Sequence, residues 1–304
     1  MAQTIKYQGS FLPIVASVYA LLAFCANVFF NSRGQIAIIP LALSIVLMLV
    51  IAVTLTRMTL QYNVFGLPTH LPAMLVLLAI TALTDPSSHL TSVVAALLTL
   101  LAIRNLNEAF SLVATTSKIF SAAIWIGILP LIFPSAIVML LALLAALILY
   151  ERDLREYVVA LIGVLTPAAI AIYSMWLLSD IEPLMTVENY IYKLMRSSNW
   201  LWYYRFDAQS FSFILALFMT LIGFLKISNL TVTSSARSRI FMAAIWCAIS
   251  TLMLLIPSFE LGDLVVIAPA IAVTATSALI TTRWWMSIAL LIASLATASL
   301  QIFW

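Results

Sequence analysis

Nearly the whole sequence is a series of apolar segments separated by short polar turns. A helix needs about 20 apolar residues to cross a hydrocarbon core about 30 Å thick, so each segment is a candidate transmembrane helix. The candidates lie at 10–30, 36–56, 71–84, 90–103, 118–132, 134–150, 157–179, 209–227, 239–257, 264–281 and 285–304. The pattern predicts an all-α polytopic transmembrane bundle of about eleven helices. We expect all of it to form a single integral membrane domain, 1–304.

Two parts of this pattern leave alternatives open. The segments within 71–103 and 118–150 are short, and each pair either crosses fully or forms a re-entrant hairpin. Proline also interrupts several apolar segments, and we expect Pro40, Pro167 and Pro269 to kink helices in mid-segment, with a substrate cavity as the alternative.

The longest interruption of the apolar pattern, 180–208, predicts a periplasmic loop with a short amphipathic helix. One face of that helix would carry Val187, Tyr190, Ile191, Leu194 and Met195. An aromatic cluster follows at 200–206, and such residues favour the membrane interface. The loop is then either a lid lying flat on the membrane or a gate in which Arg196 and Arg205 bind a phosphate or carboxylate.

The distribution of Lys and Arg predicts the orientation of the bundle. With a cytoplasmic N-terminus, ten basic residues fall on the cytoplasmic face and four outside, and the opposite orientation would invert this bias. We therefore expect an N-in, C-out protein of the bacterial inner (cytoplasmic) membrane.

Composition supports the same class. The chain is 64% hydrophobic and only 8% charged, whereas about a quarter of the residues of soluble domains are charged. The lipid bilayer is therefore an expected partner, and the net charge of +3 gives no indication of nucleic-acid binding. Cys25 and Cys247 lie in apolar segments, so neither a disulfide nor a metal site is expected.

Candidate chemistry is sparse. No charged residue lies near the centre of a predicted segment, which disfavours a proton-driven pump. If the protein is an enzyme, its catalytic candidates are Asp85, His89, Asp207 and Asp263. The candidates for binding an anion or substrate are Arg33, Arg196, Arg205, Trp202, Tyr203 and Tyr204. No cofactor is expected.

The stretch ERDLREYVVALIGVLTP contains an Arg-Glu-aromatic turn followed by an apolar run with Leu, Gly and Pro. It provides Arg155, Glu156, Tyr157, Leu161, Gly163 and Pro167. With further pieces between about 55 and 290, it resembles a family of uncharacterised polytopic inner-membrane proteins of gliding and gut-commensal Gram-negative bacteria. The resemblance implies a membrane bundle but no assigned activity.

Within that stretch, Arg155, Glu156, Gly163 and Pro167 are expected to be structural anchors. Arg155 and Glu156 would act as a coupled pair at the membrane interface, and Gly163 would let another helix approach closely.

Three functions compete. The first is a non-catalytic subunit or scaffold of a membrane complex in cell-envelope biogenesis, with a protein partner in the membrane. The second is a transferase, polymerase or flippase acting on an isoprenoid-linked (polyprenyl) glycan at the periplasmic face. The third is an ion-independent transporter of lipids or small molecules. The missing signatures favour the first and leave open whether the protein is an enzyme.

Overall fold

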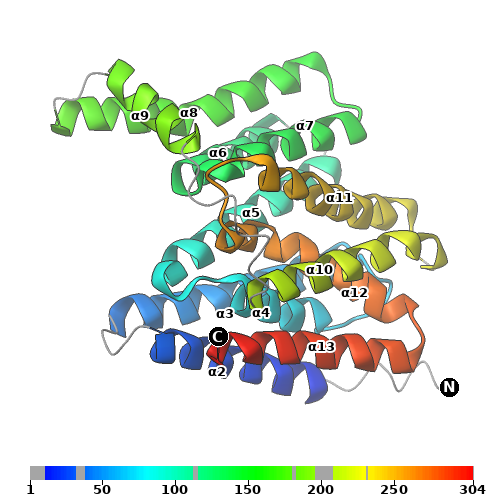
Figure 1. Cartoon of the computed structure of the whole chain (residues 1–304). Coiled ribbons are helices and arrows are strands. Elements are labelled where there is room, and N and C mark those ends of the chain that lie inside the picture. Colours follow the sequence, from blue (N-terminus) through cyan, green and yellow to red (C-terminus); the bar gives the residue numbers. More distant parts are fainter. Residues whose placement is uncertain are drawn as a thin grey trace. The chain divides into compact units, whose positions relative to one another are not determined.

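The computed structural model describes residues 11–31, 38–111, 116–179, 183–195, 208–230 and 232–303. Within this part of the chain every regular element is a helix and no strand occurs (Figure 1). The all-α class predicted from the apolar pattern is therefore confirmed.

The α-helices are α2 (Phe11–Asn31), α3 (Ile38–Gln61), α4 (Leu71–Leu83), α5 (His89–Ser111), α6 (Thr116–Ile132), α7 (Met139–Leu149), α8 (Leu154–Ser179), α9 (Pro183–Met195), α10 (Ala208–Leu225), α11 (Ser234–Ser250), α12 (Ala268–Thr281) and α13 (Trp284–Phe303). The 3-10 helices are η1 (Pro86–Ser88), η2 (Pro134–Val138), η4 (Ile227–Asn229), η5 (Thr251–Leu255) and η6 (Leu261–Ile267). The amphipathic helix predicted after residue 180 is present as α9.

Within the described residues, six stretches of helix are long and apolar enough to cross a membrane, which indicates a membrane protein. They are Pro13–Phe30, Ile38–Gln61, Pro86–Phe110, Leu154–Leu177, Ser234–Leu255 and Leu261–Thr281. Five shorter apolar helices accompany them, at Leu71–Leu83, Thr116–Ile132, Pro134–Leu149, Gln209–Leu225 and Trp285–Leu300. These stretches match the eleven segments of the sequence pattern, and the number that cross stays a prediction.

Proline residues explain where several helices begin. Pro167 lies inside α8, as expected. Pro269, in contrast, is in the first turn of α12, and Pro40 is the third residue of α3. The first turn of a helix has no intrahelical acceptor for its N–H groups, so proline is tolerated there. The expectation that Pro40 kinks a helix in mid-segment was wrong, whereas Pro269 lies inside the helical stretch Leu261–Thr281, where η6 is followed directly by α12.

Contacts divide the chain into two compact units. Unit 1 comprises Met1–Leu97, Tyr203–Cys247 and Leu264–Trp304. Its core is α4 and α12, whose residues are nearly all buried. Helix α4 packs against α2, α3, α12 and α13, and α10 packs against α12 and α13. In Figure 1, α13 (red) lies beside α2 (dark blue).

Hydroxyl groups and glycine join the helices of unit 1. The Thr81 hydroxyl of α4 donates to the Ala20 carbonyl of α2 at 3.2 Å. Thr220 of α10 and Thr274 of α12 lie 3.1 Å apart through their hydroxyls. A Cβ atom added to Gly223 would come within 2.4 Å of the Thr274 carbonyl oxygen, so α10 approaches α12 as closely as glycine allows. Such small-residue packing is typical of helices in membranes.

Unit 2 comprises Leu98–Trp202 and Ala248–Asp263. Its most extensive interface joins α6 to α8 (Figure 1). A Cβ atom on Gly163 of α8 would lie 2.7 Å from the Cβ of Ala123, and one on Gly127 of α6 would lie 2.6 Å from the Val164 carbonyl oxygen. The two helices therefore pack backbone to backbone through glycine. Away from this seam α8 is exposed, with Leu161, for example, 60% accessible.

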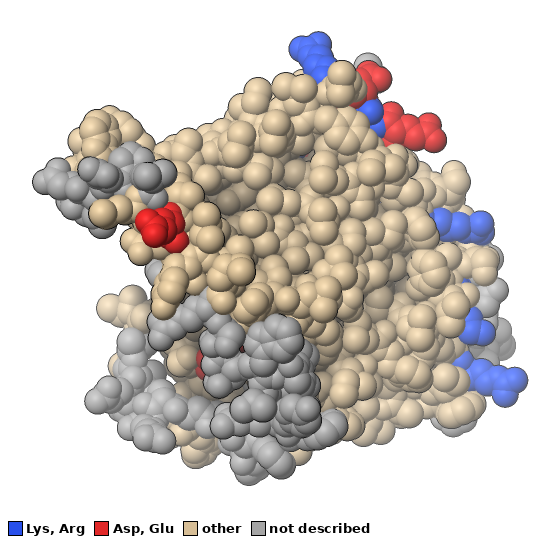
Figure 2. Space-filling view, turned by 45° about the horizontal axis from the view of Figure 1, so that its top comes forward, with Lys and Arg blue, Asp and Glu red and all other residues tan. Residues whose placement is uncertain are grey.

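Charged side chains of the described residues are sparse on the face drawn in Figure 2. Figure 2 shows a broad area that carries no Lys, Arg, Asp or Glu. Large apolar side chains are exposed on many helices, among them Leu22, Ile39, Leu177 and Ile292. A soluble monomer rarely exposes so much apolar area, whereas a bilayer covers it.

Candidate functional site

The turn between α4 and α5 in unit 1 holds two of the predicted catalytic residues, Asp85 and His89. One carboxylate oxygen of Asp85 accepts the backbone N–H of Ser87 at 3.0 Å, and the other accepts the Ser87 hydroxyl at 2.9 Å. Asp85 is therefore the N-cap of η1, a role in which Asp is common.

His89 makes its contacts independently of Asp85. Its Nδ1 lies 3.0 Å from the Pro86 carbonyl oxygen, which can only accept, so Nδ1 carries the proton in this hydrogen bond. The ring meets Phe24 edge-on, with centroids 6.4 Å apart. Within the described residues, His89 Nε2 and the hydroxyl of neighbouring Thr84 are buried without hydrogen-bond partners. The turn thus holds no acid–base pair between Asp85 and His89.

Asp263 lies in unit 2 and is only 5% exposed. Its Oδ2 accepts the Ser135 hydroxyl at 2.5 Å and the backbone N–H of Glu260 at 3.2 Å. The Asp263 N–H in turn donates to the Glu260 carbonyl oxygen at 3.0 Å. A side chain in the first turn that accepts the N–H just before the helix is half of a capping box, so Asp263 stabilises the start of η6.

The partner of Asp263, Ser135, was missed by the sequence reasoning. Ser135 is fully buried in η2, directly after Pro134. It is 128 positions from Asp263 along the chain, and neither residue has a neighbour in the sequence that points to the other. The pair ties η2 to the start of η6 inside unit 2.

Helix α9 contacts the last turn of α6 in unit 2 through Tyr190. The Tyr190 hydroxyl donates to the Pro130 carbonyl oxygen at 3.2 Å. In a continuous helix this carbonyl would accept from residue 134, but Pro134 has no N–H. Tyr190 therefore satisfies a carbonyl that proline leaves open. Burial raises the pKa of Tyr190 above its usual value of 10, so the hydroxyl remains a donor at neutral pH.

The exposed face of α9 is also apolar. Tyr190 and Leu194 are half-buried, whereas Val187, Ile191 and Met195 are exposed at four-residue spacing. The helix thus has an apolar row that is not covered by unit 2. Such a row suits a helix lying at a membrane surface.

The remaining binding candidates lie outside the described residues. They are Arg33, Arg196, Arg205, Trp202, Tyr203 and Tyr204, together with the catalytic candidate Asp207. The gate and lid interpretations of the loop therefore both stay predictions.

The Arg155 turn in unit 2 differs from expectation. Glu156 is buried and its carboxylate lies 3.7 Å from the guanidinium Nε of Arg152, while Arg155 is exposed. Arg152 also donates to the Ala109 carbonyl oxygen at 2.8 Å, which joins this turn to the end of α5. The expected coupling of Arg155 with Glu156 was wrong, because adjacent residues at a helix start point in different directions.

A second charged cluster of unit 2 is centred on Glu108. Its two carboxylate oxygens pair with Arg104 at 2.9 Å and with Lys118 at 2.5 Å. Glu108 therefore bridges the end of α5 and the start of α6. The cluster is partly exposed, and such pairs contribute little to stability individually.

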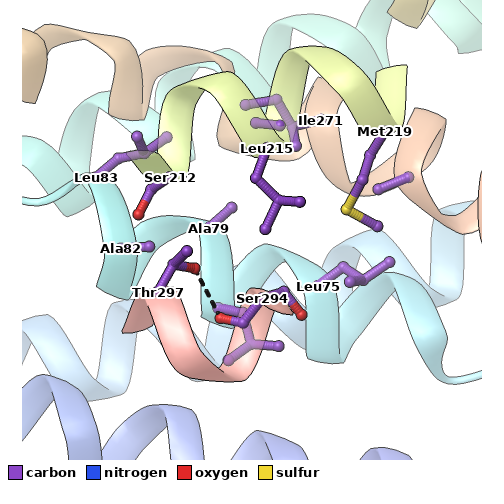
Figure 3. Close-up of a pocket in the computed structure, with 13 residues that line it drawn as sticks. Leu75, Ala79, Ala82, Leu83, Ser212, Leu215, Met219, Ile271, Ser294 and Thr297 are labelled. Carbon is purple, nitrogen blue, oxygen red and sulfur yellow. Dashed lines mark hydrogen bonds between the residues drawn. The ribbon is translucent and has the colours of Figure 1, made fainter. Parts of the chain in front are cut away.

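A small cavity lies within unit 1, between α4, α10, α12 and α13 (Figure 3). Its volume is about 40 Å³. Ten of its lining residues are apolar, and three carry hydroxyls: Ser212, Ser294 and Thr297. In Figure 3 the side chains of Ala79, Leu215 and Met219 point into the space.

The described residues do not assemble a metal site, since no group of three His, Cys, Asp or Glu side chains among them is placed to hold an ion. No family model, curated protein or solved structure matches the chain. The fold and composition indicate a helical membrane protein. Its function has to be inferred from the chemistry of its own residues.

Proposed function

We propose that the chain is a non-catalytic subunit or scaffold of a membrane complex that acts in cell-envelope biogenesis. The observation that supports it most is that the three catalytic candidates within the described residues form hydrogen bonds with structural groups around them. Asp85 caps η1, His89 Nδ1 binds a backbone carbonyl, and Asp263 caps η6. Each of these three residues has a structural partner, although within the described part of the chain His89 Nε2 is buried without one, and no two of the three pair with each other.

The same proposal places the protein in the bacterial inner membrane with eleven crossings, a cytoplasmic N-terminus and an external C-terminus. Its support is the ten-to-four bias of Lys and Arg between the two faces. A periplasm-active reporter should be active when fused to the C-terminus and inactive when fused after Glu151. The reverse pattern would overturn the orientation.

A second function, catalysis on an isoprenoid-linked glycan, is favoured by one feature of Asp263. All its carboxylate hydrogen bonds within the described part of the chain fall on Oδ2, so Oδ1 remains able to accept from a ligand. Buried acids in membrane proteins often serve function because their burial is costly. In this case Asp263 would act as the acid or base, and α9 would lie near it against η2.

Complementation of a null strain separates the two functions. Asp263→Asn preserves the size of the side chain and an oxygen that can accept from Ser135 and from the Glu260 N–H, but it removes the carboxylate. A scaffold should tolerate this change, and Asp85→Asn serves as the matched variant at the other cap. Loss of complementation by Asp263→Asn at unchanged membrane abundance would refute the scaffold and support the enzyme.

A further inference from the structure

The cavity of unit 1 is lined almost entirely by hydrocarbon. Among its hydroxyls, Ser294 donates to the Leu291 carbonyl oxygen at 2.8 Å and Thr297 donates to the Ser294 carbonyl oxygen at 2.9 Å (Figure 3). These donors are therefore used within α13. A buried water needs two to four polar partners, so this lining holds water poorly.

The cavity lies near the middle of α13. Ser294 is ten residues after the first residue of α13 and nine before the last. At 1.5 Å per residue, it lies about 15 Å from one end and about 14 Å from the other. A hydrocarbon core is about 30 Å thick, so in a spanning helix this level is the bilayer centre. Lipid headgroups cannot reach that depth, whereas the ends of acyl chains meet there.

The cavity also communicates with the surface. Ala79, Leu215 and Ala216 line it and retain part of their exposure. The medium that contacts these side chains in a membrane is lipid, so a molecule entering from this side is a hydrocarbon chain.

From this lining, depth and access, we propose that the cavity binds the terminal part of an acyl chain of a bilayer phospholipid. One water molecule needs about 10–15 Å³ of cavity volume. The cavity volume of 40 Å³ therefore has room for about three heavy atoms. The site thus holds a chain end and leaves the headgroup in the bilayer. This proposal is independent of the scaffold function, because it concerns unit 1 alone and needs no partner protein.

Photolabelling of the purified full-length protein in nanodiscs tests the site. The probe is a phospholipid with a diazirine at the end of one acyl chain, and labelled residues are identified by peptide mass spectrometry. We expect label on Leu75, Leu215 or Met219. Ala79→Leu, which adds three carbon atoms at the wall, should reduce this label several-fold. Ala289→Leu, on an exposed part of α13 outside the cavity, should leave it unchanged.

A complementary variant keeps the test decisive if Ala79→Leu does not accumulate. Leu215→Ala enlarges the cavity and should increase label on the remaining walls. Cavity label that is absent while exposed Ile292 is labelled would overturn the site, and so would label unaffected by either variant. Displacement of the phospholipid label by a small excess of a polyprenyl phosphate would also overturn it, because the occupant would then be an isoprenoid.

Discussion

The Ser135–Asp263 contact gives the sharpest stability prediction. Ser135→Ala removes the hydroxyl that donates to Asp263 Oδ2 at 2.5 Å and leaves only the 3.2 Å bond from the Glu260 N–H. A hydrogen bond to a charged group contributes about 1.5–3 kcal/mol. Asp263 is only 5% exposed, so water cannot replace the hydrogen bond that its carboxylate loses. We therefore expect Ser135→Ala to destabilise the protein by about 2 kcal/mol.

The assay is unfolding of the purified protein in mixed detergent micelles, followed by the loss of helical circular dichroism. Ser121→Ala is the matched control, since the Ser121 hydroxyl donates only to the Ser117 carbonyl oxygen of its own helix. The control should change stability by no more than a few tenths of a kcal/mol.

A double-mutant cycle completes this test. Asp263→Ala alone should cost at least as much as Ser135→Ala, because it also removes the cap of η6. The double variant should be little worse than Asp263→Ala, because residues in contact show coupling of about 0.5–3 kcal/mol. Additive losses, or a Ser135→Ala variant as stable as the control, would refute the structural role assigned to this pair.

Three further predictions concern unit 2. Gly163→Ala places a methyl group 2.7 Å from the Ala123 Cβ and should destabilise the α6–α8 seam by about 1–3 kcal/mol, measured by the same unfolding assay. Arg152→Ala should lower membrane abundance because it removes the ion pair with buried Glu156 and the hydrogen bond to the Ala109 carbonyl oxygen, whereas Arg155→Ala should not; equal abundance would contradict this assignment. Tyr190→Phe should increase hydrogen exchange in α9 with no change in overall stability above about 1 kcal/mol, and unchanged exchange would mean that its hydroxyl does not hold the helix.

Much of the fold could be predicted from the sequence, because the thickness of the bilayer sets how long an apolar segment must be to form a spanning helix. The eleven apolar segments correspond to apolar helices, and the face pattern after residue 180 predicted α9. The position of Pro40 in the first turn of α3 was also predictable, since proline is favoured where a helix begins. The partnership of Glu156 with Arg152 follows four-residue spacing, although Arg152 precedes α8 and gave no clear helical signal.

The candidate site could be predicted only in part. Asp85 and Asp263 stand out as isolated acids in an apolar sequence, but their roles depend on distant or backbone partners. Nothing near Pro134 identifies Ser135 as the donor to an acid 128 residues away. The cavity of unit 1 is a gap in the packing of four helices. Its position depends on the angles at which these helices pack, and the hydrophobic periodicity of the sequence does not predict those angles.

The scaffold function is tested most directly by purification of the tagged full-length chain from its native membrane in mild detergent, with the stoichiometry of copurifying proteins measured by mass spectrometry. We expect a membrane protein partner at a constant ratio, retained equally by Asp263→Asn. A chain that purifies alone with a bound isoprenoid-linked glycan, and loses that glycan in Asp263→Asn, would contradict it.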